Sequence, residues 1–158
     1  MPCRRGGGAR PVVGLDHVLL IHLEDLISQV LPSLSDDDLP VFIRLLLGRP
    51  FPDWSPLKLG IGPNLLYEAV AYVTGRNRDE VIRTLNTVGD LGKAVEEMLT
   101  SKSQTSFFTE ELTLAEVNAA FEEIATAEGG RSQKERVRII QRLFSSATPV
   151  QGHYITGI

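Results

Sequence analysis

Apolar residues recur at helical spacing along most of the chain. From residue 16 onward, one helical face is marked by Leu19, Leu23, Leu26, Ile27 and Val30, and Pro32 ends the run. No pair of alternating segments with a turn between them predicts a β-hairpin. Residues 1–15 are rich in Gly, Arg and Pro and show no periodicity, which indicates a disordered or non-native segment. We therefore predict one all-α domain of about eight helices over residues 16–158.

Capping residues predict where these helices begin. Ser35 precedes three aspartates, residues 36–38, that would lie in the first turn, where the helix dipole favours negative charge. Pro63 suits the first position of a helix, and Asp90 can cap another. The capping-box pattern occurs four times, in Asn77 with Glu80, Thr113 with Glu116, Ser132 with Glu135, and Thr148 with Gln151.

Glycines and prolines predict where the helices end and where a loop intervenes. Glycines follow the expected helices at positions 48, 75 and 89. Three prolines within residues 49–62 require a loop there. We expect Phe51 and Trp54 to pin this loop to the core.

Composition favours an intracellular protein that is not embedded in a membrane. The 158 residues suit one domain, and 42% of them are hydrophobic. No apolar run approaches the roughly 20 residues that span a bilayer, and glycines rather than an apolar stretch follow Arg4 and Arg5. Cys3, the only cysteine, excludes an internal disulfide and a thiolate metal cluster. We expect a cytoplasmic location and no membrane partner.

No pattern in the sequence predicts catalysis. His17 and His22 are five residues apart, which does not place them on one helical face for a metal, and His153 stands alone. The aspartates at 36–38 are explained by a solvated helix start. The Gly60–Gly62 pair is too short for a nucleotide-binding fingerprint, and no strand precedes it. We predict no catalytic residue, no metal site and no cofactor in this chain.

Positive charge is concentrated near the C-terminus. The net charge is −4, but residues 131–142 hold five basic residues and one acidic residue, so this window is +4 and the rest of the chain is −8. Two glycines and Arg131 lead into the expected helix at Ser132, whose unpaired amides would attract an anion. Lys134 and Arg138 are four residues apart and face one way. This pattern fits a phosphate site or, alternatively, a solvated basic face.

Two further segments have both a structural and a functional interpretation. Residues 56–64 (PLKLGIGPN) lead through glycines into a helix start, which fits a tight turn or a second phosphate site. Residues 104–108 (QTSFF) place Phe107 and Phe108 in a polar loop. Two adjacent aromatic rings are costly to leave in water, so they either fold into the core or anchor a partner.

Taken together, several blocks resemble the N-terminal DNA-binding domain of archaeal and eukaryotic ATP-dependent DNA ligases. They are residues 45–54 (LLLGRPFPDW), 57–62 (LKLGIG), 88–92 (VGDLG), 112–117 (LTLAEV), 132–134 (SQK), 143–144 (LF) and 147–149 (ATP). The blocks occur in the family's order and at about its spacing, from residue 23 to the end. The resemblance implies an all-helical domain that grips the backbone of nicked duplex DNA, with DNA contacts at Lys58, Gly60, Gly62, Arg131, Ser132, Gln133 and Lys134.

The resemblance also implies a protein partner. Archaeal members carry a short Gln-x-x-Phe-Phe motif that binds the sliding clamp, PCNA, and Gln104, Phe107 and Phe108 match it. The phenyl rings would enter an apolar pocket of the clamp, and Gln104 would hydrogen-bond at its edge. The longer form of the motif has an aliphatic residue that this segment lacks.

Two departures from the family pattern indicate a domain truncated at both ends. Residues 1–15 do not resemble the family's first helix, and the sequence stops within an expected further helix. No Lys-x-Asp-Gly motif is present, so we expect this chain not to be an enzyme on its own. The resemblance implies that ATP and Mg²⁺ serve the catalytic core of the full-length ligase, which is a further partner. The alternatives are a clamp-interaction module, or a helical DNA-binding, regulatory or glycosylase-like protein with no ligase link.

Overall fold

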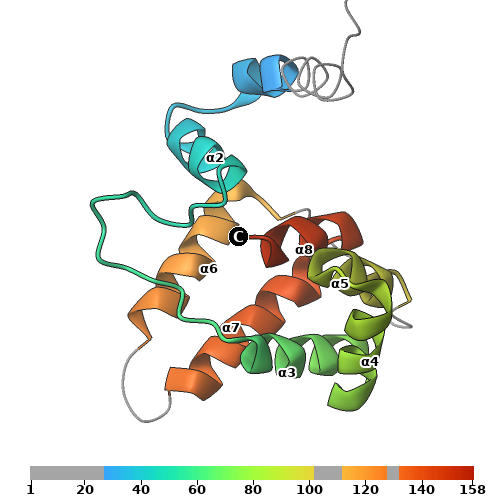
Figure 1. Ribbon diagram of the computed structural model, residues 1–158. Coiled ribbons are helices and arrows are strands. Elements are labelled where there is room, and N and C mark those ends of the chain that lie inside the picture. The colour runs from blue at the N-terminus through green and yellow to red at the C-terminus, as the bar shows by residue number, and fades with distance from the viewer. Residues whose placement is uncertain (1–26, 102–111, 128–131) are drawn as a thin grey trace, which may run out of the picture. The chain divides into compact units, whose positions relative to one another are not determined.

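The computed structural model describes residues 27–101, 112–127 and 132–158 of the chain. Across these ranges it contains the α-helices α2 to α8, four further α-helical residues at 27–30, one short 3-10 helix and no strand (Figure 1). The predicted all-α class is therefore confirmed. The chain divides into two compact units, Met1–Leu39 and Pro40–Ile158. None of the helices in the described ranges is both long enough and apolar enough to cross a membrane.

The described part of the first unit ends in a capped turn. Residues 27–30 are helical and continue into the 3-10 helix η1 (Leu31–Ser33), which contains Pro32. Ser35 Oγ accepts a hydrogen bond from the Asp38 backbone N–H at 3.1 Å, as a capping residue does. Helix α2 (Asp38–Leu46) begins only at Asp38. The expected helical turn of three aspartates is therefore wrong for residues 36 and 37, which form a turn before the helix.

Six helices of the second unit begin close to where the sequence predicts, and five of them also end there. They are α3 (Pro63–Thr74), α4 (Arg78–Val88), α5 (Leu91–Thr100), α6 (Leu114–Thr126), α7 (Ser132–Ser146) and α8 (Pro149–Thr156). Helix α8 is the exception, because it was expected to continue to the last residue and ends at Thr156. The capping boxes of α4, α6 and α8 are confirmed, and Asp90 caps α5. Positive φ angles at Gly75 and Gly89 end α3 and α4. In the α6 box the Thr113 backbone N–H and hydroxyl both donate to Glu116, which lowers the pKa of that carboxyl.

The fourth predicted capping box is not what the structure shows. Ser132 is the first residue of α7 and not the residue before it. Glu135 lies 3.5 Å from Arg138 Nη1 and makes an exposed ion pair one turn along the helix. Ser132 therefore belongs to the helical first turn, and the residue that precedes the helix lies outside the described ranges.

Helix α7 is the central element of the second unit. Its predicted apolar face is buried, with Val137, Ile139, Ile140, Leu143 and Phe144 each at most 6% exposed. Helix α3 crosses it and α6 runs beside it, while α8 packs against α5 (Figure 1). This packing covers one face of α7 and leaves the other face to solvent.

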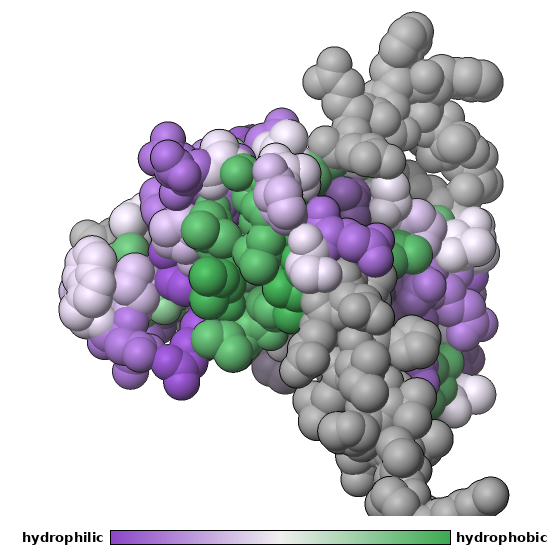
Figure 2. Space-filling model, turned by 90° about the horizontal axis from the view of Figure 1, so that it is seen from above, coloured by the Kyte–Doolittle hydropathy of each residue, from purple (hydrophilic) through white to green (hydrophobic). Residues whose placement is uncertain are grey.

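Apolar side chains also reach the surface. The large exposed ones include Leu46 and Leu47 near the end of α2, and Val150 and Tyr154 on α8. Figure 2 shows apolar residues gathered into one area of the face that it presents.

The loop at 49–62 is pinned to the core by one aromatic ring and not by two. Phe51 is 9% exposed and belongs to the hydrophobic core, as predicted. Trp54 is 86% exposed, so its predicted anchoring role is wrong. The Arg49 guanidinium pairs with the Asp53 carboxylate at 2.8 Å in this part of the loop.

The two aromatic residues of this loop should differ sharply in their effect on stability. Phe51→Ala removes a buried ring, and we expect it to lower the free energy of unfolding by about 3 kcal/mol. Trp54→Ala removes an exposed ring, and we expect a change within about 0.5 kcal/mol. Urea unfolding followed by circular dichroism measures both. Equal losses for the two variants would contradict this account of the loop.

Candidate functional site

Two segments predicted as separate phosphate sites lie side by side in the structure. One is the extended segment 57–62, which leads into α3, and the other is the first part of α7. Arg136, in the second turn of α7, joins them, because its Nη1 donates to the Gly60 carbonyl at 3.3 Å. The two residues are 76 positions apart in the sequence. The tertiary fold therefore makes one candidate surface out of two predicted segments.

Gly60 is required by the geometry of this junction. Its φ of +58° lies in the left-handed region, which residues with a side chain adopt at a cost. A Cβ atom at this position would also lie 3.1 Å from Arg136 Nη1. Gly62 is under neither constraint: its φ is −83°, it caps α3, and nothing would lie within 4 Å of its Cβ. Of the two predicted glycines, only Gly60 is fixed by backbone conformation and close packing.

The start of α7 is accessible to a ligand. Ser132 is half-buried, whereas Gln133 and Lys134 are exposed. The first backbone N–H groups of a helix have no partner within the helix, and together with the helix dipole they favour an anion. Arg131, which we also predict to bind DNA, lies outside the described residues.

Among the described residues, Lys134 is the basic side chain of α7 that has no ion-pair partner. Arg138 pairs with Glu135 at 3.5 Å, and Arg142 pairs with Glu123 at 2.6 Å. The Arg136 guanidinium donates to backbone carbonyls. Within the described parts of the chain, no carboxylate pairs with Lys134 or with the exposed Lys58. Arg138 shares its face with a carboxylate, so its predicted contribution is weaker than that of Lys134.

Two residues near this surface were not singled out from the sequence as site residues. Arg136 was counted only as part of the basic window. Arg78, the first residue of α4, donates through Nη2 to Asn64 Oδ1 at 2.6 Å and so brings a cation beside the first turn of α3. Arg78 and Asn64 are 14 positions apart and on different helices, so helical periodicity does not predict their contact.

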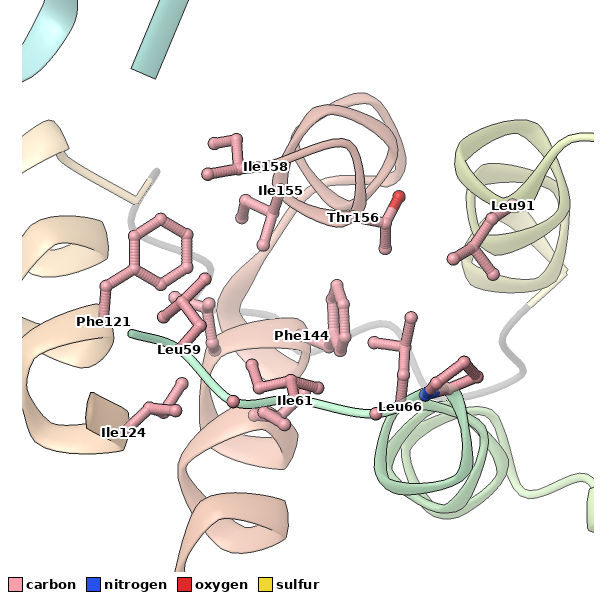
Figure 3. Close-up of a pocket in the computed structure, with 15 residues that line it drawn as sticks. Leu59, Ile61, Leu66, Leu91, Phe121, Ile124, Phe144, Ile155, Thr156 and Ile158 are labelled. Atoms are coloured by element: carbon pink, nitrogen blue, oxygen red, sulfur yellow. The ribbon is translucent and has the colours of Figure 1, made fainter. Parts of the chain in front are cut away.

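Behind the extended segment lies an apolar cavity of about 320 Å³. Leu59 and Ile61 of the segment lie among the side chains of Phe121 and Phe144, which come from α6 and α7 (Figure 3). Thr156 provides the one polar side chain in the lining. Among the described residues the lining has no acid, base or strong nucleophile. The cavity shows how alternate residues of segment 57–62, Leu59 and Ile61, anchor the segment, while Lys58 stays exposed.

The remaining candidates serve the fold or lie outside the described residues. His153 Nδ1 lies 2.8 Å from Glu96 Oε2, a contact that joins α8 to α5. No group of three His, Cys, Asp or Glu side chains gathers in a metal-binding arrangement anywhere in the described ranges. His17, His22 and the three clamp-motif residues, Gln104, Phe107 and Phe108, lie outside those ranges.

Comparison with known proteins gives the family. Residues 19–158 match the family described as "DNA ligase N terminus". The chain is 71% identical to a DNA ligase of Methanospirillum hungatei JF-1 over 126 residues, which is 80% of this chain and 23% of that protein. It is 53% identical to a DNA ligase of Methanosphaerula palustris over 135 residues (85% and 24%). It is 36% identical to one of Methanothermobacter thermautotrophicus over 132 residues (84% and 24%). The chain thus spans about a quarter of the length of these relatives.

The two glycines of the segment should respond oppositely to the same substitution. Gly60→Ser forces a side chain into the left-handed region and against Arg136, and we expect it to lower the free energy of unfolding by about 1–2 kcal/mol. Gly62→Ser places a good capping residue at the start of α3, in open space and with a suitable backbone, and should leave stability unchanged or slightly raised. Denaturant unfolding of the two variants compares them. A loss at Gly62 as large as at Gly60 would contradict the assignment.

Proposed function

The chain belongs to the family of DNA ligase N-terminal domains, and we propose that it binds nicked double-stranded DNA through the sugar–phosphate backbone. The observation that carries the proposal is the surface on which Arg136 joins segment 57–62 to the start of α7. This surface presents the exposed side chains of Lys58, Gln133 and Lys134 beside two helix N-termini. Cations and free amides together are the chemistry that phosphate groups need.

Binding of this kind does not depend on base sequence. Phosphates are the same at every base pair, so contacts to them fix the position of a protein on DNA without reading it. Neutralised phosphates release counterions, and affinity falls steeply as salt rises. The acidic remainder of the chain does not prevent this, because at physiological salt each charge is screened within about 8 Å.

In a longer ligase this domain would hold the nick for a catalytic core that acts in DNA replication, repair and recombination. These processes take place inside the cell, so we also propose an intracellular location. ATP and Mg²⁺ would serve that core. The residues present here do not fit either group, since the sequence has no Lys-x-Asp-Gly and the described part has no cluster of metal ligands. The alternative of a helical protein with no ligase link is wrong, because the family match covers residues 19–158.

A charge reversal at Lys134 tests the proposal. We expect Lys134→Glu to weaken binding to nicked duplex roughly tenfold at low salt and to reduce the slope of log K against log [salt] by about 1. Gel-shift titrations at several salt concentrations, on two unrelated duplex sequences, measure both quantities. The loss should be equal on the two sequences.

Lys93→Glu is the matched control for this experiment. Lys93 is exposed on α5 (Leu91–Thr100), which belongs neither to segment 57–62 nor to α7. This variant makes the same change of net charge and should bind DNA as the parent chain does. If the two variants lost affinity equally, the effect would come from net charge and not from the proposed surface.

We further propose that Gln104, Phe107 and Phe108 bind the sliding clamp. The sequence motif alone supports this proposal. The three residues lie outside the ranges that the structure describes. Phenyl rings that enter an apolar pocket contribute much of the binding energy at protein interfaces. The two proposals are compatible, because the motif and the DNA surface use different residues.

Substitution of both rings separates clamp binding from DNA binding. We expect Phe107→Ala with Phe108→Ala to abolish binding to PCNA in a pull-down assay, while the affinity for nicked duplex changes less than twofold. Thermal unfolding serves as the control. A double variant that no longer folds would show that the rings belong to the core, and the clamp proposal would fail.

A further inference from the structure

We propose that Arg136 is a positioning residue for DNA binding: its guanidinium holds segment 57–62 in register with the first turn of α7. In that register Lys58 and Lys134 meet the same stretch of DNA backbone. This inference rests on the proposed function, and it gives Arg136 a role that differs from that of the lysines. The lysines contact phosphate, whereas Arg136 sets the distance between the two segments that carry them.

The Arg136 guanidinium bridges two parts of the fold through backbone atoms alone. Its Nε donates to the Ile124 carbonyl at 3.1 Å, and its Nη2 donates to the Ala127 carbonyl at 3.2 Å. The third bond runs from Nη1 to the Gly60 carbonyl at 3.3 Å. Three nitrogens thus donate in three directions fixed by one planar group. A lysine ammonium at the end of a flexible chain does not reproduce that fork.

The charge of Arg136 is held where the fold favours a cation. Helix α6 ends at Thr126, so the carbonyls of Ile124 and Ala127 lie at its C-terminal end. Carbonyls there have no partner further along the helix, and the helix dipole makes that end negative. On α7, Val137 is buried next to Arg136 and anchors its backbone. The guanidinium is therefore oriented by its own neighbours before any DNA is present.

Segment 57–62 is held at its end by the Gly62 carbonyl, which accepts from the N–H groups of Leu65 and Leu66, and by few directional contacts before that. Leu57, Leu59 and Ile61 pack against the core and set the depth of the segment. Contacts of this kind are non-directional, so they tolerate sliding along the segment. Among the described residues, the bond from Arg136 to Gly60 is the one hydrogen bond from another element to residues 57–61. Loss of this bond would leave the segment docked but free to shift Lys58 away from Lys134.

The charge-conserving substitution Arg136→Lys separates positioning from direct contact. We expect Arg136→Lys and Arg136→Gln to weaken binding to nicked duplex alike, by at least fivefold, because both lose the fork although only one loses the charge. Arg142→Lys and Arg142→Gln are the matched controls on the same helix and should stay within twofold of the parent. Parent-like binding by Arg136→Lys with weakened binding by Arg136→Gln would show that Arg136 contacts phosphate directly, and this would overturn the proposal.

A double-mutant cycle with Lys58 supplies a readout that a general loss of stability would not move. Lys58→Ala should weaken binding in the parent chain but should have little further effect once Arg136 is lysine, because the segment is already misplaced. Full additivity of the two substitutions would overturn the proposal. Should Arg136→Lys fail to fold, Gly60→Ser takes its place, since it disturbs the same bond and leaves the arginine intact. Parent-like DNA affinity in that variant would also overturn the proposal.

Limited proteolysis distinguishes failure of this inference from failure of the proposed function. If the parent chain does not bind nicked duplex at low salt, DNA binding itself is refuted and the affinity assays lose their meaning. The rate of tryptic cleavage after the exposed Lys58 measures, without DNA, how firmly segment 57–62 is held. This rate should rise several-fold in Arg136→Lys, or in Gly60→Ser in its place, while cleavage after the exposed Lys93 stays unchanged. An unchanged rate of cleavage after Lys58 would overturn the positioning role.

Discussion

The burial of one face of α7 is the constraint on which the rest of the second unit depends. The apolar residues from Val137 to Phe144 are covered by α3 and α6, and their burial fixes the direction in which the helix points. Since burial is confined to one side and to the middle and end of the helix, its first turn stays at the surface. An anion site at a helix start requires this combination of a rigid helix and an open N-terminus. The stability of the core and the accessibility of the site are two consequences of the same packing.

The ability of a basic residue on the candidate surface to attract a phosphate depends on its partners within the chain and not on the number of basic residues nearby. Four of the five basic residues between 131 and 142 are described, and three of these interact with carboxylates or carbonyls of the chain itself. Exposed ion pairs of this kind add little stability, but they reduce the positive potential near the paired arginines. In the part of the chain that the structure describes, no carboxylate pairs with Lys134 or Lys58, on a protein whose net charge is −4. The domain therefore combines an acidic body with a small basic surface, which suits the proposed binding of phosphate without base recognition.

The family relationship and the geometry support different parts of the functional argument. The match to DNA ligase N-terminal domains over residues 19–158 gives the family, and the chain spans about a quarter of the length of these relatives. The geometry adds what a family name does not contain, namely the contact of Arg136 with the loop and the exposure of Lys134. It also separates the polar surface from the apolar cavity behind it, where Leu59 and Ile61 anchor the segment.

Most of the secondary structure could be predicted from the sequence because its signals are local. The capping bonds of Asn77, Thr113 and Thr148 join residues three positions apart, so a short stretch of sequence contains both partners. Helix class and the buried face of α7 follow from spacing in the same way. The exposure of Trp54 and the three bonds of Arg136 do not, because they depend on which distant segment lies nearby in space. Gly60 and Arg136 are 76 residues apart, and only the packing of α3, α6 and α7 brings them within 3.3 Å.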